Sequence, residues 1–226
     1  MSYQLFLGFT YEGSTDERFL VGIIERTIAD LIFQYGNKDV ELLLIPIKGK
    51  GENFVSQSLQ SIKKGFIDNS TDLFFIHCDA DDKSTDDVIK YKFEKLYEEL
   101  QKNNELIECK VIPIIPVFMS ESWMLADFDL FKNEIFTNKT KAQLNISGNP
   151  ENISNPKLRI IEALHIVNKE LPKKRRKELE ISDLYQILGQ KIPLNKLLTL
   201  NSFKDFYFLT FNSLKELKLI DHTNNL

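Results

Sequence analysis

Apolar residues follow two alternating patterns along the N-terminal half of the chain. Short, nearly continuous apolar runs predict buried strands, whereas longer stretches with an apolar residue every three or four positions predict amphipathic helices. In the first such stretch, Phe19, Ile23 and Leu31 share one helical face, and Ser14 or Thr15 is expected to cap the helix. Further helices are predicted between the strands. The predicted strands are Tyr3–Phe9, Val40–Ile47, Asp72–Cys78 and Val111–Val117.

The alternation of strands and helices predicts an α/β fold. Strands that are apolar on both faces are typical of a parallel sheet with right-handed crossovers and helices on either side. We therefore expect a parallel sheet of about four strands sandwiched by helices. Pro113 and Pro116 favour an edge position or a strand end over a central strand, because proline cannot donate a ladder hydrogen bond.

From Ser120 onward the pattern becomes helical. The segment from Trp123 to Phe131 is expected to be a helix, the stretch from Asn138 to Pro156 is polar and loop-like, and three or four helices follow. The chain is thus predicted to divide into an α/β core, residues 1–118, and a helical extension, residues 119–226.

Composition is that of an ordinary soluble globular protein. The 226 residues are 42% hydrophobic and 27% charged, which is enough to bury one substantial core. Cys78 and Cys109 fall inside apolar runs and are interpreted as buried thiols in a reducing compartment. The start of the sequence lacks a signal-peptide pattern, and no apolar run has the length of a membrane span. We therefore expect a cytoplasmic protein without a membrane partner.

Net charge argues against general binding of a polyanion. The formal charge is −4, whereas nonspecific nucleic-acid binding depends on Lys and Arg facing phosphates. Any such binding must be local or assisted by a partner. One basic cluster stands out, and acidic residues follow it at once, so it is either a phosphate-contacting patch or a solvated segment. The cluster contains Lys173, Lys174, Arg175 and Arg176.

A second candidate phosphate-binding segment follows the second predicted strand. Gly49 and Gly51 would allow the backbone to approach a ligand, and Lys48 and Lys50 could neutralise phosphate charge. A simple flexible turn is the alternative. The segment lacks the spacing of a Walker A loop, which is the motif that best indicates nucleotide hydrolysis.

Carboxylates gather where three predicted strands end. Glu12 follows the first strand, Asp79, Asp81 and Asp82 follow the third, and Glu121 follows the fourth. Ligands of an open parallel sheet bind beyond the carboxyl ends of its strands, so these acids should share one rim. Crowded carboxylates are costly unless a cation neutralises them, and Mg²⁺ prefers such oxygen ligands. The sequence therefore predicts a Mg²⁺ site, which Mn²⁺ can also fill.

Each of these acids also has a plainer interpretation. Glu12 alone would be a solvated turn residue, and Glu121 would be a first-turn glutamate that the helix dipole favours. Asp82 could be a ligand, a residue behind the ligands, or a solvated side chain. His77 is more readily explained as a buried histidine than as a ligand. The joint placement of the acids favours the metal interpretation.

Two short segments resemble the motifs of TOPRIM domains. The sequence Glu12-Gly13-Ser14-Thr15-Asp16 resembles the TOPRIM glutamate motif, and His77-Cys78-Asp79-Ala80-Asp81 looks like its DxD motif. In that family the glutamate is a general acid/base or metal ligand, and the two aspartates hold Mg²⁺. The resemblance gives these catalytic and metal-binding roles to Glu12, Asp79 and Asp81.

Two later segments extend the resemblance. Ser120-Glu121-Ser122-Trp123-Met124-Leu125-Ala126-Asp127 resembles a motif that follows the TOPRIM core in OLD-nuclease-like bacterial proteins. Asn201-Ser202-Phe203-Lys204-Asp205-Phe206 looks like their closing segment. Such proteins are often encoded beside ATPases in defence loci, so the resemblance implies an ATPase partner and a toxin-like role in antiviral defence.

The leading hypothesis is a Mg²⁺-dependent nuclease that cuts DNA or RNA with a metal-positioned water. A topoisomerase tyrosine is not identifiable, which disfavours strand passage. Two alternatives remain open. The chain could be an interaction module that is silent or activated only by its partner, or it could be a phosphatase or phosphotransferase that acts on small molecules.

Overall fold

The computed structural model has an α/β core built on one parallel sheet. It describes residues 2–103, 106, 110–170 and 178–221. Within these residues the sheet has four strands in the order β2-β1-β3-β4, and every neighbouring pair is parallel. This confirms the predicted fold class. The strands are β1 (Tyr3–Thr10), β2 (Val40–Pro46), β3 (Leu73–His77) and β4 (Lys110–Ile114).

Strand β4 lies at an edge of the sheet, as its prolines predicted. It ends at Ile114, before Val117, where the sequence pattern had placed its end. The pairing of β3 with β4 reaches only His77 and Ile114. Beyond that point Pro116 has no N–H to donate, and its carbonyl instead accepts a hydrogen bond from the Ala80 amide at 3.1 Å.

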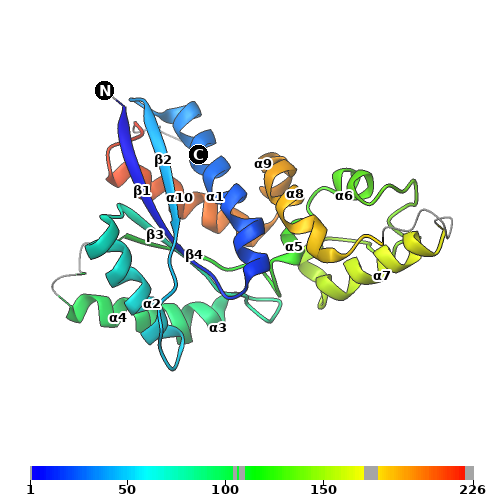
Figure 1. Ribbon diagram of the computed structural model, residues 1–226, viewed down its shortest axis with the longest axis horizontal. Helices are drawn as coiled ribbons and strands as arrows, with labels where there is room; N and C mark the ends of the chain where they lie inside the picture. Colours follow the sequence, from blue (N-terminus) through cyan, green and yellow to red (C-terminus); the bar gives the residue numbers. More distant parts are fainter. Residues whose placement is uncertain (1, 104–105, 107–109, 171–177, 222–226) are drawn as a thin grey trace.

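One face of the sheet packs against α1 (Ser14–Tyr35) and α10 (Asn201–Glu216). Alternate strand residues such as Phe9 and Phe75 point into this layer and join the larger hydrophobic core. Phe75 meets Phe206 of α10 edge-to-face, with ring centroids 6.1 Å apart. A helix from the far end of the sequence therefore covers the central sheet (Figure 1).

The opposite face is covered by two further helical stretches. The first is α2, which continues into a π-helical turn, and the second also contains a π-helical turn between two α-helical segments. Phe74 and Ile76 of β3 point to this side, into a smaller core. The elements are α2 (Phe54–Lys63), η1 (Lys64–Asp68), α3 (Asp86–Val88), η2 (Ile89–Phe93) and α4 (Glu94–Lys102).

The helical extension lies beside the N-terminal half of α1 (Figure 1). Its α8 crosses α1 closely at Gly189, where an added Cβ would lie 2.2 Å from the Phe19 carbonyl oxygen. The elements are α5 (Glu121–Met124), α6 (Phe128–Glu134), η3 (Pro150–Asn152), α7 (Pro156–Glu170), η5 (Ile181–Asp183), α8 (Leu184–Lys191) and α9 (Leu194–Leu197).

The two later segments that resemble OLD-nuclease-like proteins contact each other through their side chains in the core. Trp123 Nε1 donates to Ser202 Oγ at 2.8 Å, and Ser202 Oγ donates to the buried Glu151 carboxylate at 2.6 Å. Glu151 also accepts the Asn201 and Ser202 amides, so it caps the start of α10. The extension and the sheet therefore share one hydrophobic core. The division at residue 118 stays a prediction.

Two further local predictions differ from the structure. The cap of α1 is Gly13, not Ser14 or Thr15, and the Asp16 carboxylate accepts the Gly13 amide at 2.9 Å. The helix expected from Trp123 to Phe131 is split into α5 and α6, because Asp127 is extended and caps α6 with its side chain.

Among the helices of the described part of the chain, none combines the length and apolar character that a bilayer crossing demands.

Candidate functional site

The loops that follow β3 and β4 are hydrogen-bonded to each other at the carboxyl edge of the sheet. The Asp81 amide donates to the Phe118 carbonyl at 2.8 Å, and the Phe118 amide donates to the Asp82 carbonyl at 2.9 Å. Asp81 and Phe118 both have left-handed backbones, with φ of 55° and 59°. Such a conformation is costly for a bulky residue such as phenylalanine, by about 1–3 kcal/mol, and it often occurs at functional sites.

Behind these loops lies a group that we call the buried cluster: Asp16, His77, Asp79 and Ser120. Asp79 Oδ1 accepts the Ser120 amide at 3.0 Å and lies 3.1 Å from His77 Nε2. Ser120 Oγ donates to Asp16 Oδ1 at 2.7 Å and lies 3.2 Å from the same His77 nitrogen. The cluster joins the first turn of α1, the end of β3 and the residue before α5, so it fixes the position of Asp79.

His77 is fully enclosed in this cluster. Burial lowers its pKa, but the hydrogen bond and charge of Asp79, followed by the charges of Asp16 and Glu12, more than offset burial, so the pKa is raised overall. Its Nδ1 is buried and has no hydrogen-bond partner among the described residues. The imidazole therefore places a positive or proton-donating group next to the acids of the rim.

The buried cluster contains the residue types of a serine hydrolase triad but not its geometry. Ser120 has no exposed surface, and both Ser120 and Asp79 meet the same imidazole nitrogen. A triad needs an accessible serine at one ring nitrogen and a carboxylate at the other. Nucleophilic catalysis by Ser120 is therefore disfavoured.

Asp16, His77 and Asp79 offer ligand atoms that all lie within 4.8 Å of one another. The Ser120 hydroxyl lies among these atoms, so an ion bound there would have to replace its hydrogen bonds. The Asp79 side chain is 19% exposed, whereas that of His77 is 0% exposed. Asp79 is thus the member of the cluster that best reaches solvent.

Next to the buried cluster is a cavity of about 360 Å³, which we call the open pocket. Glu12, Lys48, Gly49, His77 and Lys92 are among the residues that line it. They come from the loops after β1 and β2, the end of β3 and the turn η2. The open pocket therefore lies at the carboxyl edge of the sheet, where ligands of parallel sheets bind.

The Glu12 carboxylate lies on the exposed side of this pocket, and its pKa is raised. Desolvation by its surroundings raises its pKa, the His77 charge lowers it, and the Asp79 charge raises it again, with a net increase. The deprotonated carboxylate is therefore disfavoured next to Asp79. A bound cation would relieve this repulsion.

Lys92 supplies a positive charge to the same pocket. Its Nζ donates to the Cys78 thiol at 2.9 Å, and although burial lowers its pKa, Cys78, Glu12 and Asp81 raise it overall. The Cys78 pKa rises to about 12, chiefly through burial, so the thiol is neutral near pH 7. Sequence reasoning missed Lys92, although one signal was present. It occupies the apolar stripe formed with Val88, Leu96 and Leu100.

A family model described as a domain of unknown function, DUF4276, matches residues 11–206. The chain belongs to the DUF4276 family. The match includes Glu12 and Asp79, both loops of the rim and the helical extension up to the middle of α10. No curated protein and no solved structure matches the chain significantly.

The DUF4276 chain brings only some of the predicted acids together. Glu12 lines the open pocket, the Asp79 charge is near enough to raise its pKa, and Asp81 lies close enough to raise the Lys92 pKa. Asp82 is exposed, and its Oδ1 accepts the adjacent Lys83 amide at 2.6 Å. Among the described residues, the predicted acids do not form a compact set of three ligands.

Glu121 has different partners from the other predicted acids. It is buried, it accepts a short hydrogen bond from the Tyr185 hydroxyl, and its Oε1 lies 3.6 Å from Lys157 Nζ. Burial and then the Glu121 interactions raise the Tyr185 pKa. These contacts hold the Glu121 carboxylate inside the helical extension. Its predicted metal role stays a prediction.

The predicted lysines also divide into two groups. Lys48 lines the open pocket with its Nζ 4.2 Å from the Tyr11 ring centroid, and Lys50 is exposed nearby. The glycine between them packs against α2, where an added Cβ would lie 2.2 Å from the Gln57 carbonyl oxygen. Gly49 therefore brings the loop close to a helix, whereas the sequence interpretation was a close approach to a ligand. Lys173, Lys174, Arg175 and Arg176 lie outside the described residues.

Asp16 was also missed as a site residue. It lies in the quoted glutamate motif, one helical turn after Glu12, but acids in a first turn are so common that they indicate only a cap. Its contact with Ser120 joins residues 104 positions apart. A single sequence contains no signal for such a contact.

Proposed function

We propose that the DUF4276 chain is a Mg²⁺-dependent hydrolase of nucleic-acid phosphodiesters with a TOPRIM-type site. One observation carries the proposal: Glu12 and Asp79 follow the adjacent strands β1 and β3, the Asp79 charge raises the Glu12 pKa, and Glu12 lines a pocket that two lysines also line. Negative ligands for a cation and positive groups for a phosphate thus occur together.

The donor set fits Mg²⁺. The ion usually takes one or two protein carboxylates and completes its shell with water and phosphate oxygens, so Glu12 and Asp79 suffice, and exposed Asp81 can add a third oxygen. Mn²⁺ accepts the same donors. When bound, the metal would supply Lewis-acid stabilisation of phosphate charge and a more acidic water.

The protein residues have separate roles in this proposal. Asp16, His77 and Ser120 hold Asp79 in place through the buried cluster. Lys48 and Lys92 attract the phosphate and stabilise the charge that develops on it. A Glu12 carboxylate that ligates the metal through one oxygen leaves the other to accept a proton from the attacking water.

The biological setting is also part of the proposal. The resemblance to OLD-nuclease-like proteins favours an ATPase partner and a role in antiviral defence. The free thiol of Cys78 supports a reducing compartment, and we therefore place the protein in the cytoplasm.

A second candidate is hydrolysis of a small phosphate ester. The size of the open pocket, about 360 Å³, favours it, because a cavity of this volume can enclose a small ligand. Comparing a mononucleotide with an oligonucleotide as substrate separates the two candidates.

The proposal is tested by incubating single- and double-stranded DNA and RNA with Mg²⁺ or Mn²⁺, with and without the ATPase partner. We expect metal-dependent cleavage that Asp79→Asn reduces by about 10²–10⁴-fold. Asp87→Asn is the matched control, because Asp87 is an exposed acid at the start of α3. Equal activity of Asp79→Asn and Asp87→Asn would overturn the proposal, as would cleavage in EDTA.

A further inference from the structure

A second cavity, of about 450 Å³, lies next to the open pocket, and we call it the lysine pocket. Lys48, Lys50, Lys63 and Lys64 line it, and Asp68 is the one acid among its lining residues. Within the described part of the chain, Lys48, Lys50 and Lys64 form no ion pair. A chain with a net charge of −4 thus carries a local concentration of positive charge.

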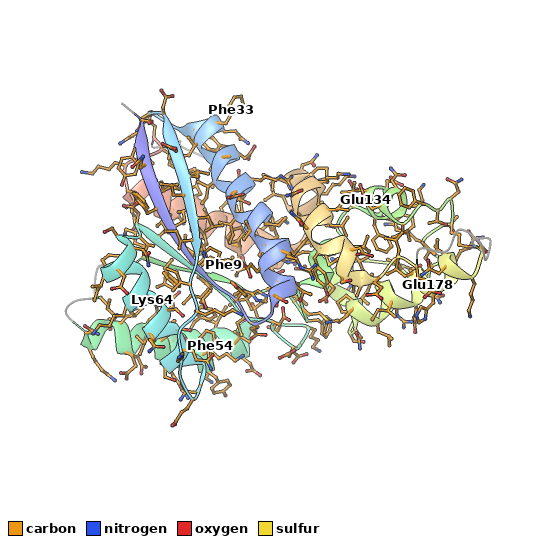
Figure 2. All side chains as sticks on the ribbon, viewed as in Figure 1. Phe9, Phe33, Phe54, Lys64, Glu134 and Glu178 are labelled. Carbon is orange, nitrogen blue, oxygen red and sulfur yellow. The ribbon has the colours of Figure 1, made fainter. Side chains whose placement is uncertain are left out.

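The lysine pocket is a fixed part of the fold. The loop after β2 runs along α2, where the Gly49 amide donates to Ser61 Oγ at 2.7 Å and the Lys50 amide donates to the Gln60 side chain. This docking places Lys48 and Lys50 beside the lysines at the C-terminal end of α2. In Figure 2, Phe54 and Lys64 mark the two ends of this helical stretch. The backbone that carries Lys48 and Lys50 is therefore held in place before any ligand binds.

The lysine pocket and the open pocket are adjacent, because Lys48 lines both. The open pocket contains Glu12 and lies against the buried cluster, whereas the lysine pocket contains none of the candidate metal ligands. A small phosphate ester could occupy only one of them. A polynucleotide can present phosphates to both, because its charges recur at every nucleotide.

Other features of the lysine pocket also favour a nucleic-acid strand. Lys side chains contact phosphates without reading sequence, which suits a strand that is held by its backbone. The Gln60 amide offers hydrogen bonds, and Ile67 is 52% exposed at the pocket and offers apolar contact. A mixture of positive, polar and apolar groups is typical of grooves that follow a single strand.

We propose that the lysine pocket binds a backbone phosphate of a nucleic-acid strand whose scissile phosphate lies in the open pocket. The inference rests on the proposed function and deepens it. It makes the substrate a polynucleotide and assigns a path along the C-terminal end of α2. It also adds Lys63 and Lys64 to the predicted phosphate-binding lysines.

The test measures binding of a fluorescent single-stranded 12-mer, as DNA and as RNA, by anisotropy in EDTA. The double variant K50A/K64A is compared with K196A/K204A, which removes two exposed lysines of the helical extension. At about 100 mM salt we expect K50A/K64A to weaken binding by roughly tenfold or more. The slope of log affinity against log salt should fall by about 2, one for each phosphate contact.

The control variant should keep the wild-type affinity and slope. Equal affinities of the two double variants would overturn the assignment, as would wild-type protein that does not bind the 12-mer at low salt. Thermal melting of both variants checks that the fold is intact. Inorganic phosphate at equal charge concentration should compete weakly, because it fills only one pocket at a time.

Failure of the two proposals can be told apart, because strand binding in EDTA does not depend on hydrolysis. A protein that cleaves but binds equally well in both double variants retains the proposed function and loses the strand path. A protein that binds through Lys50 and Lys64 but never cleaves loses the hydrolase function alone.

Discussion

The buried cluster and the open pocket lie next to each other at the carboxyl edge of the sheet, but the surroundings of their carboxylates differ. In the buried cluster, Asp16 and Asp79 are satisfied by Ser120 and His77 at hydrogen-bond distance. In the open pocket, Glu12 has a raised pKa and faces space that a ligand can enter. Hydrogen bonds hold the side chains of the buried cluster in place, whereas the open pocket retains a carboxylate whose charge a ligand could neutralise.

This difference gives Asp79 a special position. It belongs to the buried cluster through Oδ1, and it also raises the Glu12 pKa at the pocket. Buried carboxylates with hydrogen-bond partners stabilise a fold, whereas a destabilised charge commonly marks a functional site. Variants of the two regions should therefore change different properties.

The largest effect is expected from Glu12→Gln. Loss of this carboxylate should reduce cleavage by about 10²-fold or more, because it removes both a metal ligand and a proton acceptor. Its thermal stability should be unchanged or slightly higher, since the charged form is disfavoured in the fold. Glu94→Gln, on an exposed face of α4, is the control. A Glu12→Gln variant that loses stability but keeps full activity would show that Glu12 has a structural role and not a functional one.

Ser120→Ala should reduce the free energy of unfolding by about 1–3 kcal/mol, because it leaves the Asp16 carboxylate and His77 imidazole without their shared partner. Ser122→Ala is a matched control. The Ser122 hydroxyl is buried and has no partner among the described residues, so its removal should be neutral or stabilising. Urea denaturation measures both. Equal effects at the two serines would contradict the account of the cluster.

Tyr185→Phe should cost about 1–2 kcal/mol, because among the described residues it leaves buried Glu121 with the Lys157 contact alone. Tyr91→Phe, at an exposed ring, is the control. Metal affinity, measured by calorimetry with Mn²⁺, should not change if Glu121 is a structural residue. Weaker binding would instead support its predicted place among the metal ligands.

The smallest effect is a pH dependence of stability without metal. Since the pKa of Glu12 is raised on folding, the folded chain binds more protons than the unfolded chain near that pKa. Stability from this group is thus present at low pH and lost as pH rises through the folded pKa. In EDTA, wild type should lose stability relative to Glu12→Gln as the pH rises above the ordinary glutamate pKa of 4.5. An opposite slope would mean that the pocket stabilises the carboxylate.

Much of the fold could be predicted because local patterns determine it. Continuous apolar runs such as Leu73–His77 identified buried parallel strands, and prolines identified β4 as an edge. The rim position of Glu12 and Asp79 followed from the same strand order. What could not be predicted depends on contacts between distant residues. Ser120 joins Asp16 and Asp79, and Tyr185 holds Glu121 across 64 positions.

Some unpredicted features did leave a trace. Lys92 breaks an apolar helical stripe, and its half-buried ammonium group has polar partners in Cys78 and the nearby acids. Asp127 divides a predicted helix because aspartate is a strong cap. The sequence pattern contained both residues, but only their neighbours in space determine what they do.

The most direct test of the central claim is a crystal structure of the protein soaked with Mn²⁺, with the ion located by its anomalous signal. We predict an ion that Glu12 and Asp79 share at the open pocket, at oxygen distances of about 2.0–2.6 Å. An ion held by Asp16, His77 and Asp79 in place of the Ser120 contacts would contradict the account. So would a well-soaked crystal in which Glu12 and Asp79 bind no ion.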